Sequence, residues 1–161
     1  MSDDHKAVVD GITNLVADTQ AHKDLADHLL RRRQIVVNLG AETASPAAKH
    51  LLYVVDEDCR VMSFKVCSAV AVTASDTDYF TEQLVYNDLA AGADVAISDI
   101  MTTKVTGGAA YVAAIPKTFT GIAATGDAVA AGKGIYLDQT KGGAGKDNHR
   151  SCILTLEYGT R

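Results

Sequence analysis

Residues 61–72 read Val-Met-Ser-Phe-Lys-Val-Cys-Ser-Ala-Val-Ala-Val, and this stretch decides the expected fold. Its larger apolar side chains recur at every second position, whereas small or polar side chains mostly occupy the positions between them. Because successive side chains of a strand point to opposite faces, a period of two predicts an extended strand with one buried face. We therefore expect a central strand that begins at Cys59 and has its core face formed by Met62, Phe64, Val66, Val70 and Val72.

The chain on both sides of this stretch repeats the pattern in shorter segments, separated by turns rich in Gly, Asp and Thr. Eight or nine short strands without βαβ alternation are typical of an antiparallel sandwich. The expected fold class is therefore all-β, an antiparallel β-sandwich of jelly-roll-like type. Besides the central strand, we expect strands at residues 34–39, 51–55, 79–86, 95–105, 119–123, 134–138 and 151–158, and residues 109–115 are ambiguous between a strand and a helical turn.

The N-terminal residues have a helical pattern instead. Ser2 can cap a helix whose first turn carries Asp3 and Asp4, where the helix dipole favours negative charge. A thin apolar stripe follows, and it could form a weak coiled coil between copies, lie on another protein, or pack on the chain's own sheet. We expect an N-terminal α-helical arm at residues 1–33 and a β-sandwich domain at residues 34–161, with the stripe at Val8, Ile12, Leu15, Thr19, His22, Ala26 and Leu29.

Length and charge limit the classes of partner. The 161 residues suffice for one domain with a core, and the net charge of −5 with a pI near 5.4 argues against nucleic-acid binding. The only basic run, at residues 31–33, also suits the carbonyl end of a helix. No apolar run approaches the roughly 20 residues of a membrane span, and residues 1–6 do not resemble a signal peptide. We expect neither nucleic acid nor membrane as a partner.

The residues that most often carry chemistry are scattered along the chain. Three cysteines without a CxxC pair, Cys59, Cys67 and Cys152, are a poor framework for disulfides or for a zinc site, so we expect free, buried thiols in a protein assembled in a reducing compartment. No pair of histidines has the spacing of four residues that suits a helical metal site. A cupin-like metal site needs His and Glu clustered on facing strands, and only His50 and Glu82 lie near predicted strands.

Two further patterns resemble ligand-binding loops. Residues 142–147 read Gly-Gly-Ala-Gly-Lys-Asp, but a phosphate-binding loop needs Ser or Thr after the Lys, so a hairpin loop is the better interpretation. The acidic turns at residues 56–58 and 76–78 could hold Ca²⁺, yet neither fits an EF-hand, and Asp is common in turns because it bonds its own backbone. We therefore expect no catalytic residue, no metal and no cofactor.

The order of four strand and turn segments along the chain can be compared with that of known protein families. Cys59-Arg60-Val61 opens a long strand, and a Thr- and Asp-rich turn leads into an aromatic strand at residues 73–86. A Val-Ala-Ala-Gly turn precedes a short strand at residues 129–137, and a Gly-rich loop leads into a final Leu-Glu-Tyr strand at residues 142–158. In this order, residues 53–158 resemble small β-sandwich proteins of tailed-bacteriophage virions, of the head decoration or head fibre type. The chain departs from that pattern where residues 132–134 read Gly-Lys-Gly in place of a Gly-Asp pair, and residues 1–40 lie outside the resemblance.

The resemblance implies a non-enzymatic structural protein of the virion. Such a protein is synthesised in the host cytoplasm and binds the major capsid protein on the capsid surface, as a symmetric oligomer and commonly a trimer. Our hypothesis is that the capsid or subunit contact lies at Ile12, Leu15, Leu25, Leu29, Arg31, Arg32 and Arg33. The alternative is a carbohydrate- or receptor-binding module of a phage tail or fibre, for which Tyr111 is the main stacking aromatic outside the predicted strands.

Overall fold

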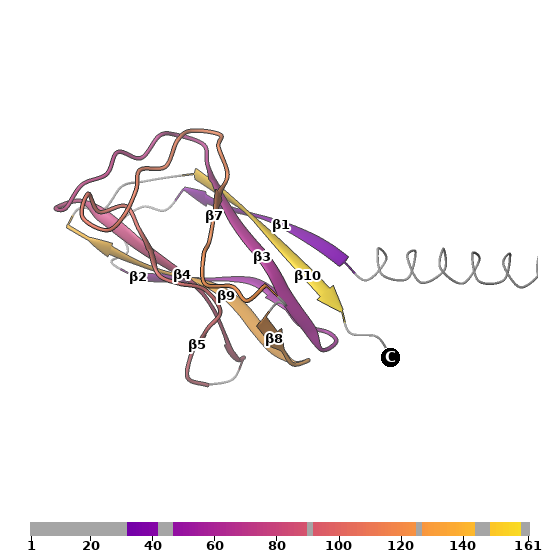
Figure 1. Cartoon of the computed structure of the whole chain (residues 1–161). Coiled ribbons are helices and arrows are strands. Elements are labelled where there is room, and N and C mark those ends of the chain that lie inside the picture. The colour runs from indigo at the N-terminus through magenta and orange to yellow at the C-terminus, as the bar shows by residue number, and fades with distance from the viewer. Residues whose placement is uncertain (1–31, 42–46, 90–91, 125–126, 144–148, 159–161) are drawn as a thin grey trace, which may run out of the picture. The chain divides into compact units, whose positions relative to one another are not determined.

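The computed structural model describes residues 32–41, 47–89, 92–124, 127–143 and 149–158 (Figure 1). The chain divides into two units, Met1–Arg32 and Arg33–Arg161, and nearly all described residues belong to the second. The predicted helical arm at residues 1–33 therefore lies almost wholly outside the described residues. No described residue belongs to a helix long and apolar enough to cross a membrane.

The all-β prediction is confirmed, because the described residues form ten strands in two five-stranded antiparallel sheets. The first sheet has the order β1 (Arg32–Ala41), β10 (His149–Tyr158), β3 (Cys59–Ser68) and β7 (Lys117–Thr118), with β8 (Asp127–Val129) also paired to β3. The second has the order β2 (Ala47–Val54), β9 (Lys133–Gly142), β4 (Tyr79–Asp88) and β5 (Val95–Ala96), with β6 (Met101–Thr102) also paired to β4. The strands β1 to β4 thus alternate between the two sheets.

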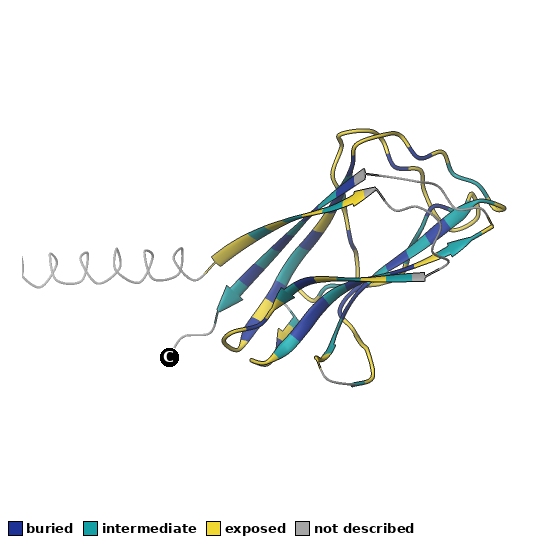
Figure 2. Ribbon diagram, turned by 180° about the vertical axis from the view of Figure 1, so that it is seen from behind, coloured by how far each residue is buried: buried dark blue, intermediate teal, exposed yellow. Residues whose placement is uncertain are grey.

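A single main apolar core fills the space between the sheets, and Figure 2 shows its buried residues along the long strands. Phe64 on β3 packs edge-on against Phe119, with ring centroids 4.8 Å apart. Each fully buried side chain of this size contributes about 1.5–3 kcal/mol through the hydrophobic effect, so this layer supplies most of the stability of the fold. Its other large members are Leu84, Ile135, Leu137, Leu154 and Leu156.

A β-bulge changes the predicted core face of β3. Thr155 pairs with Ser63, but the next residue, Leu156, pairs with Val61, so Met62 is the extra residue. Phe64 and Val66 are buried as predicted, whereas Val61 is buried in place of Met62. The prediction for Met62 is wrong because one extra residue shifts the alternation by one, and a strict period of two contains no signal for that shift.

Several predicted strand limits are also wrong. β3 ends at Ser68, so Val70 is 49% exposed, and Val72 is buried through an isolated bridge with Tyr111. The predicted strand at residues 95–105 is replaced by the two-residue strands β5 and β6. No strand forms at the described residues 119–123, because the strand nearest to them, β7, ends at Thr118. Gly121 has φ +81°, a left-handed conformation that does not occur within a regular strand. The strand β8 was not predicted.

Candidate functional site

The predicted contact residues lie at the N-terminal end of the chain, mostly outside the part that the structure describes. Arg32 and Arg33 are described, and both are exposed at the beginning of β1. Of the predicted contact residues, the structure therefore shows the surroundings of Arg32 and Arg33 only. The predicted contacts outside the described residues are Ile12, Leu15, Leu25, Leu29 and Arg31.

Arg33 belongs to a polar cluster that joins the two sheets at one end of the sandwich. Its Nη1 donates a hydrogen bond to Tyr53 Oη at 2.9 Å and lies 3.6 Å from the Asp56 carboxylate. Tyr53 in turn donates to Asp56 at 2.7 Å, and its hydroxyl oxygen lies 3.0 Å from that of Tyr158. The Arg33 guanidinium also lies over the Tyr158 ring, 5.1 Å from its centroid. The cluster thus ties β1 and β10 to β2.

The charges of this cluster suit a structural contact. The hydrogen bond from Tyr53 holds the pKa of Asp56 below its usual value. Tyr158 raises the pKa of Arg33, with further contributions from Tyr53 and Asp56, and burial raises the pKa of the Tyr158 hydroxyl. Each shift moves the pKa further from 7, so Asp56 and Arg33 are charged and Tyr158 is neutral near pH 7. General acid–base catalysis needs a group that titrates near the working pH, so these groups are poorly suited to it.

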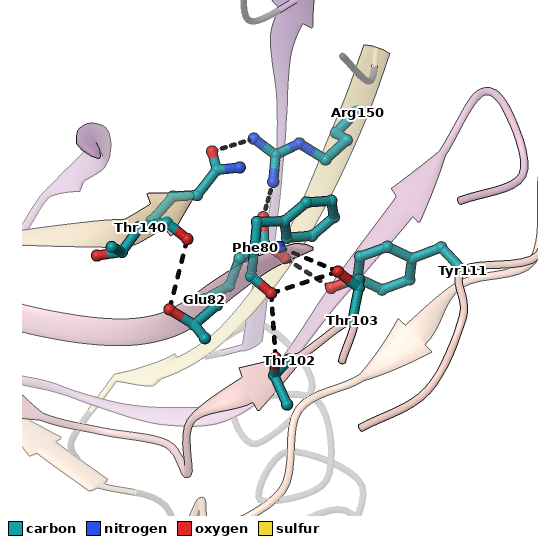
Figure 3. Close-up of polar contacts among 9 residues, drawn as sticks. Phe80, Glu82, Thr102, Thr103, Tyr111, Thr140 and Arg150 are labelled. Atoms are coloured by element: carbon teal, nitrogen blue, oxygen red, sulfur yellow. Dashed lines mark hydrogen bonds and ion pairs between the residues drawn. The ribbon is translucent and has the colours of Figure 1, made fainter. Parts of the chain in front are cut away.

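A second polar cluster lies inside the sandwich (Figure 3). Arg150 on β10 forms an ion pair with Glu82 on β4 and donates a hydrogen bond to Gln139 Oε1 on β9 at 2.6 Å. Tyr111 donates a hydrogen bond to Glu82 Oε2, also at 2.6 Å. All four side chains are at most 3% exposed. A buried charge requires such a partner. Because Arg150 lies in the first sheet and Glu82 and Gln139 lie in the second, this cluster links the two sheets.

Tyr111 is buried in this cluster, so it is not available as the stacking aromatic of a carbohydrate-binding module. Its ring stacks on Phe80 with centroids 5.5 Å apart, and burial raises the pKa of its hydroxyl. This cluster was not predicted from the sequence, although the sequence contains one signal for it. Glu82 alternates with the core residues Phe80 and Leu84 in a predicted strand, which places a carboxylate on the buried face.

One aspartate of each acidic turn, Asp58 and Asp76, accepts hydrogen bonds from backbone amides. Asp76 accepts hydrogen bonds from the amides of Val105 and Thr106, at 3.1 and 3.2 Å. Asp58 accepts one from the amide of Ala131 at 2.8 Å. Within the described ranges, no three His, Cys, Asp or Glu residues lie close enough to hold a metal ion. These aspartates thus fix loops to one another.

The three cysteines are free thiols, as expected. Burial raises the pKa of Cys59 to about 11 and that of Cys152 to about 12, so both are protonated near pH 7. Cys67 is only half-buried, so the expectation of a buried thiol is wrong for this residue. Because the thiolate is the nucleophile, we expect the two buried thiols to react slowly in the folded protein.

An aliphatic patch lies where residues 69–71 run antiparallel to residues 112–115. The bridge between Val72 and Tyr111 holds the two segments together, with backbone hydrogen bonds of 2.9 and 3.0 Å. All seven residues are Ala, Val or Ile and all are exposed, including Val112 at 55% and Ile115 at 58%. A cavity of about 310 Å³ opens beside Ala69 and Ala114. Contiguous exposed apolar surface of this kind marks contact sites between proteins.

Comparisons with known proteins do not place the chain in a family. No protein-family model matches the sequence, and no curated protein matches it. Among solved structures, the chain is similar to one from the structure of the infectious bursal disease virus Gx strain, with a TM-score of 0.41 and 10% sequence identity. The match covers 81% of this chain and 33% of the other, so this chain spans about a third of that length. A likeness this distant assigns no function.

Proposed function

We propose that this protein is a non-enzymatic structural component of a virion, which binds the outside of a phage capsid as a symmetric oligomer. The strand order supports the proposal. If β5 with β6 and β7 with β8 each count as one strand, the orders 1-10-3-7 and 2-9-4-5 are those of a jelly roll, an architecture common in viral capsid domains. A jelly roll occurs in proteins of many functions, so the fold alone does not determine the function. Among these functions, the resemblance of residues 53–158 to head decoration proteins favours a role on the capsid surface.

The observation that carries the proposal is the aliphatic patch at residues 69–71 and 112–115. Its two segments contain no charged residue, and Val70, Val112 and Ile115 are each about half exposed. An uncharged surface of this kind suits docking on another folded protein. Docking at the repeated sites of a capsid lattice would add avidity if several contacts of one oligomer engage together. The proposed partner is the major capsid protein.

The test is binding to purified heads of the virus whose genome carries the gene. We expect the protein to sediment with intact heads in a fixed ratio. Deletion of residues 1–30 should abolish binding if the N-terminal contact is required, and Val112→Asp with Ile115→Asp should weaken binding at least tenfold if the aliphatic patch docks. Val95→Asp is the matched control, because Val95 on β5 is 46% exposed and lies outside the patch.

Failure of the unaltered protein to bind heads would overturn the proposed function. If neither the deletion nor the patch variant weakens binding, the contact lies on another surface. Specific binding to a glycan array would instead favour the carbohydrate-binding module, for which Tyr111 is no longer a candidate because it is 3% exposed.

A further inference from the structure

The strand β1 is the long unprotected edge of the described fold. Among the described strands it pairs with β10 alone, so its other edge can accept a further strand. The edge strands β5, β6, β7 and β8 have only two or three residues each. The remaining edge strand, β2, carries Lys49, whose Nζ bonds Asp94 at 2.6 Å. Short edges and charged edges resist pairing with another chain, whereas β1 has ten residues and no charge or proline after Arg33.

We propose that β1 pairs antiparallel with β1 of a second copy, across a two-fold axis at Val36. Residues 34–38 read Gln-Ile-Val-Val-Asn, which has the same chemical order from either end. With Val36 opposite Val36 of the second copy, Gln34 faces Asn38 and Ile35 faces Val37 in each half. A two-fold contact requires a surface that complements itself in this way, and such cross-strand pairs stabilise a sheet.

The apolar side chains of β1 are only partly buried, so they provide apolar surface area for this contact. Val36 is 64% exposed on the outer face. On the inner face, Ile35, Val37 and Leu39 pack against the core but are only half-buried, because β1 lies at the sheet edge. A second β1 would cover Ile35 with Val37 on the inner face and Val36 with its own counterpart on the outer face.

The charges of β1 do not oppose the pairing. In this register Arg32 faces Gly40 and Arg33 faces Leu39. The two Arg32 residues lie eight positions apart, roughly 26 Å along the strand, which exceeds the Debye length of about 8 Å at physiological salt. Each Arg33 is already paired within its own copy with Asp56, at 3.6 Å.

The pairing determines the copy number independently of capsid binding. A two-fold contact yields two copies or a multiple of two, whereas the resemblance to decoration proteins implies three. The mass of the full-length protein in solution therefore distinguishes the two, and it does so whether or not the protein binds heads.

The experiment measures the mass of the full-length protein and three variants by light scattering and native mass spectrometry. We expect the parent to have an even copy number. Val36→Lys places two ammonium groups opposite each other and should raise the dissociation constant at least tenfold, as should Val36→Glu. An equal mixture of the two should recover pairs that contain one copy of each, because Lys then faces Glu. The control is Leu51→Lys on β2, at a side chain 48% exposed, which should keep the parent mass.

Three outcomes would overturn the proposal. They are a parent that is monomeric or has three copies, a Val36→Lys variant that keeps the parent mass, and a mixture of the Lys and Glu variants that stays dissociated. Circular dichroism of each variant confirms that the sandwich is folded before masses are compared.

Discussion

Arg150 on β10 forms an ion pair with Glu82 on β4, and the two residues thereby join opposite sheets through charges that are almost completely buried. Gln139 and Tyr111 supply the neighbouring hydrogen bonds, so the cost of removing both charges from water is partly offset. Such a pair adds little net stability over an apolar pair of equal volume, but the loss of one partner leaves a buried charge without compensation.

The first prediction concerns this ion pair. Arg150→Met should lower the free energy of unfolding by about 3–5 kcal/mol, because the Glu82 carboxyl group remains buried without its ion-pair partner. Glu82→Leu combined with Arg150→Met should cost much less than the sum of the two single changes. Urea unfolding of the parent, the two single variants and the double variant provides the measurement. The control is Lys49→Met at the more exposed pair with Asp94, which should cost less than about 1 kcal/mol, and a similar value for Arg150→Met would contradict the prediction.

The second prediction compares two glycines with left-handed backbones. A Cβ at Gly143 (φ +62°) would meet the carbonyl of Thr77 and the side chain of Asp78, whereas a Cβ at Gly132 (φ +82°) would meet nothing within 4 Å. Gly132→Ala should cost about 1–2 kcal/mol from backbone strain alone, and Gly143→Ala should cost clearly more. Thermal unfolding of both variants measures the difference, and equal costs would exclude the close contact at Gly143.

The third prediction concerns thiol reactivity. A chromogenic thiol reagent at pH 8 should modify Cys67 in the native protein, whereas Cys59 and Cys152 should react only after unfolding, because burial raises their pKa values. Mass spectrometry of peptides locates the label. Rapid labelling of Cys152 in the folded protein would show that β10 opens more readily than its burial indicates.

The fourth prediction follows from the same two thiols at alkaline pH. Their folded pKa values lie above the usual value, so the unfolded chain loses these protons first, and the stabilising contribution is complete below about pH 8.5. It should be lost as the pH rises towards 11 for Cys59 and 12 for Cys152. Urea unfolding between pH 8 and 10.5 should show a shallower decline for Cys59→Ala than for the parent. Val61→Ala, at a buried side chain that carries no titratable group, serves as the control and should keep the parent slope.

The fifth prediction tests the Arg33 cluster at acidic pH. The folded pKa of Asp56 is depressed by the hydrogen bond from Tyr53, so its contribution to stability is present above the unfolded value near 3.9 and is lost as the pH falls through the folded value. Tyr53→Phe should raise the pKa of Asp56 towards its usual value, as measured by NMR titration. Asp94, whose pKa is lowered by Lys49, provides the internal control and should not change.

The long strands were predictable from the sequence because each is half-buried and alternates over many residues. The expected strands at residues 34–39, 79–86 and 151–158 lie within β1, β4 and β10. The short strands were not predictable in the same way. A segment of two residues is too short to show an alternating pattern. The strands β5 and β6 are defined by their pairing with β4, and β7 by its pairing with β3.

The sequence by itself determined the all-β class and the location of the long strands, because alternation along one strand is a local property. It did not determine where that alternation shifts, as at Met62, since a bulge depends on the strand that lies opposite. Only the tertiary structure brought Glu82 to Arg150 and Arg33 to Tyr158. Each of these contacts joins residues far apart in the chain, and whether two charges meet depends on which strands pack together, which no local pattern encodes.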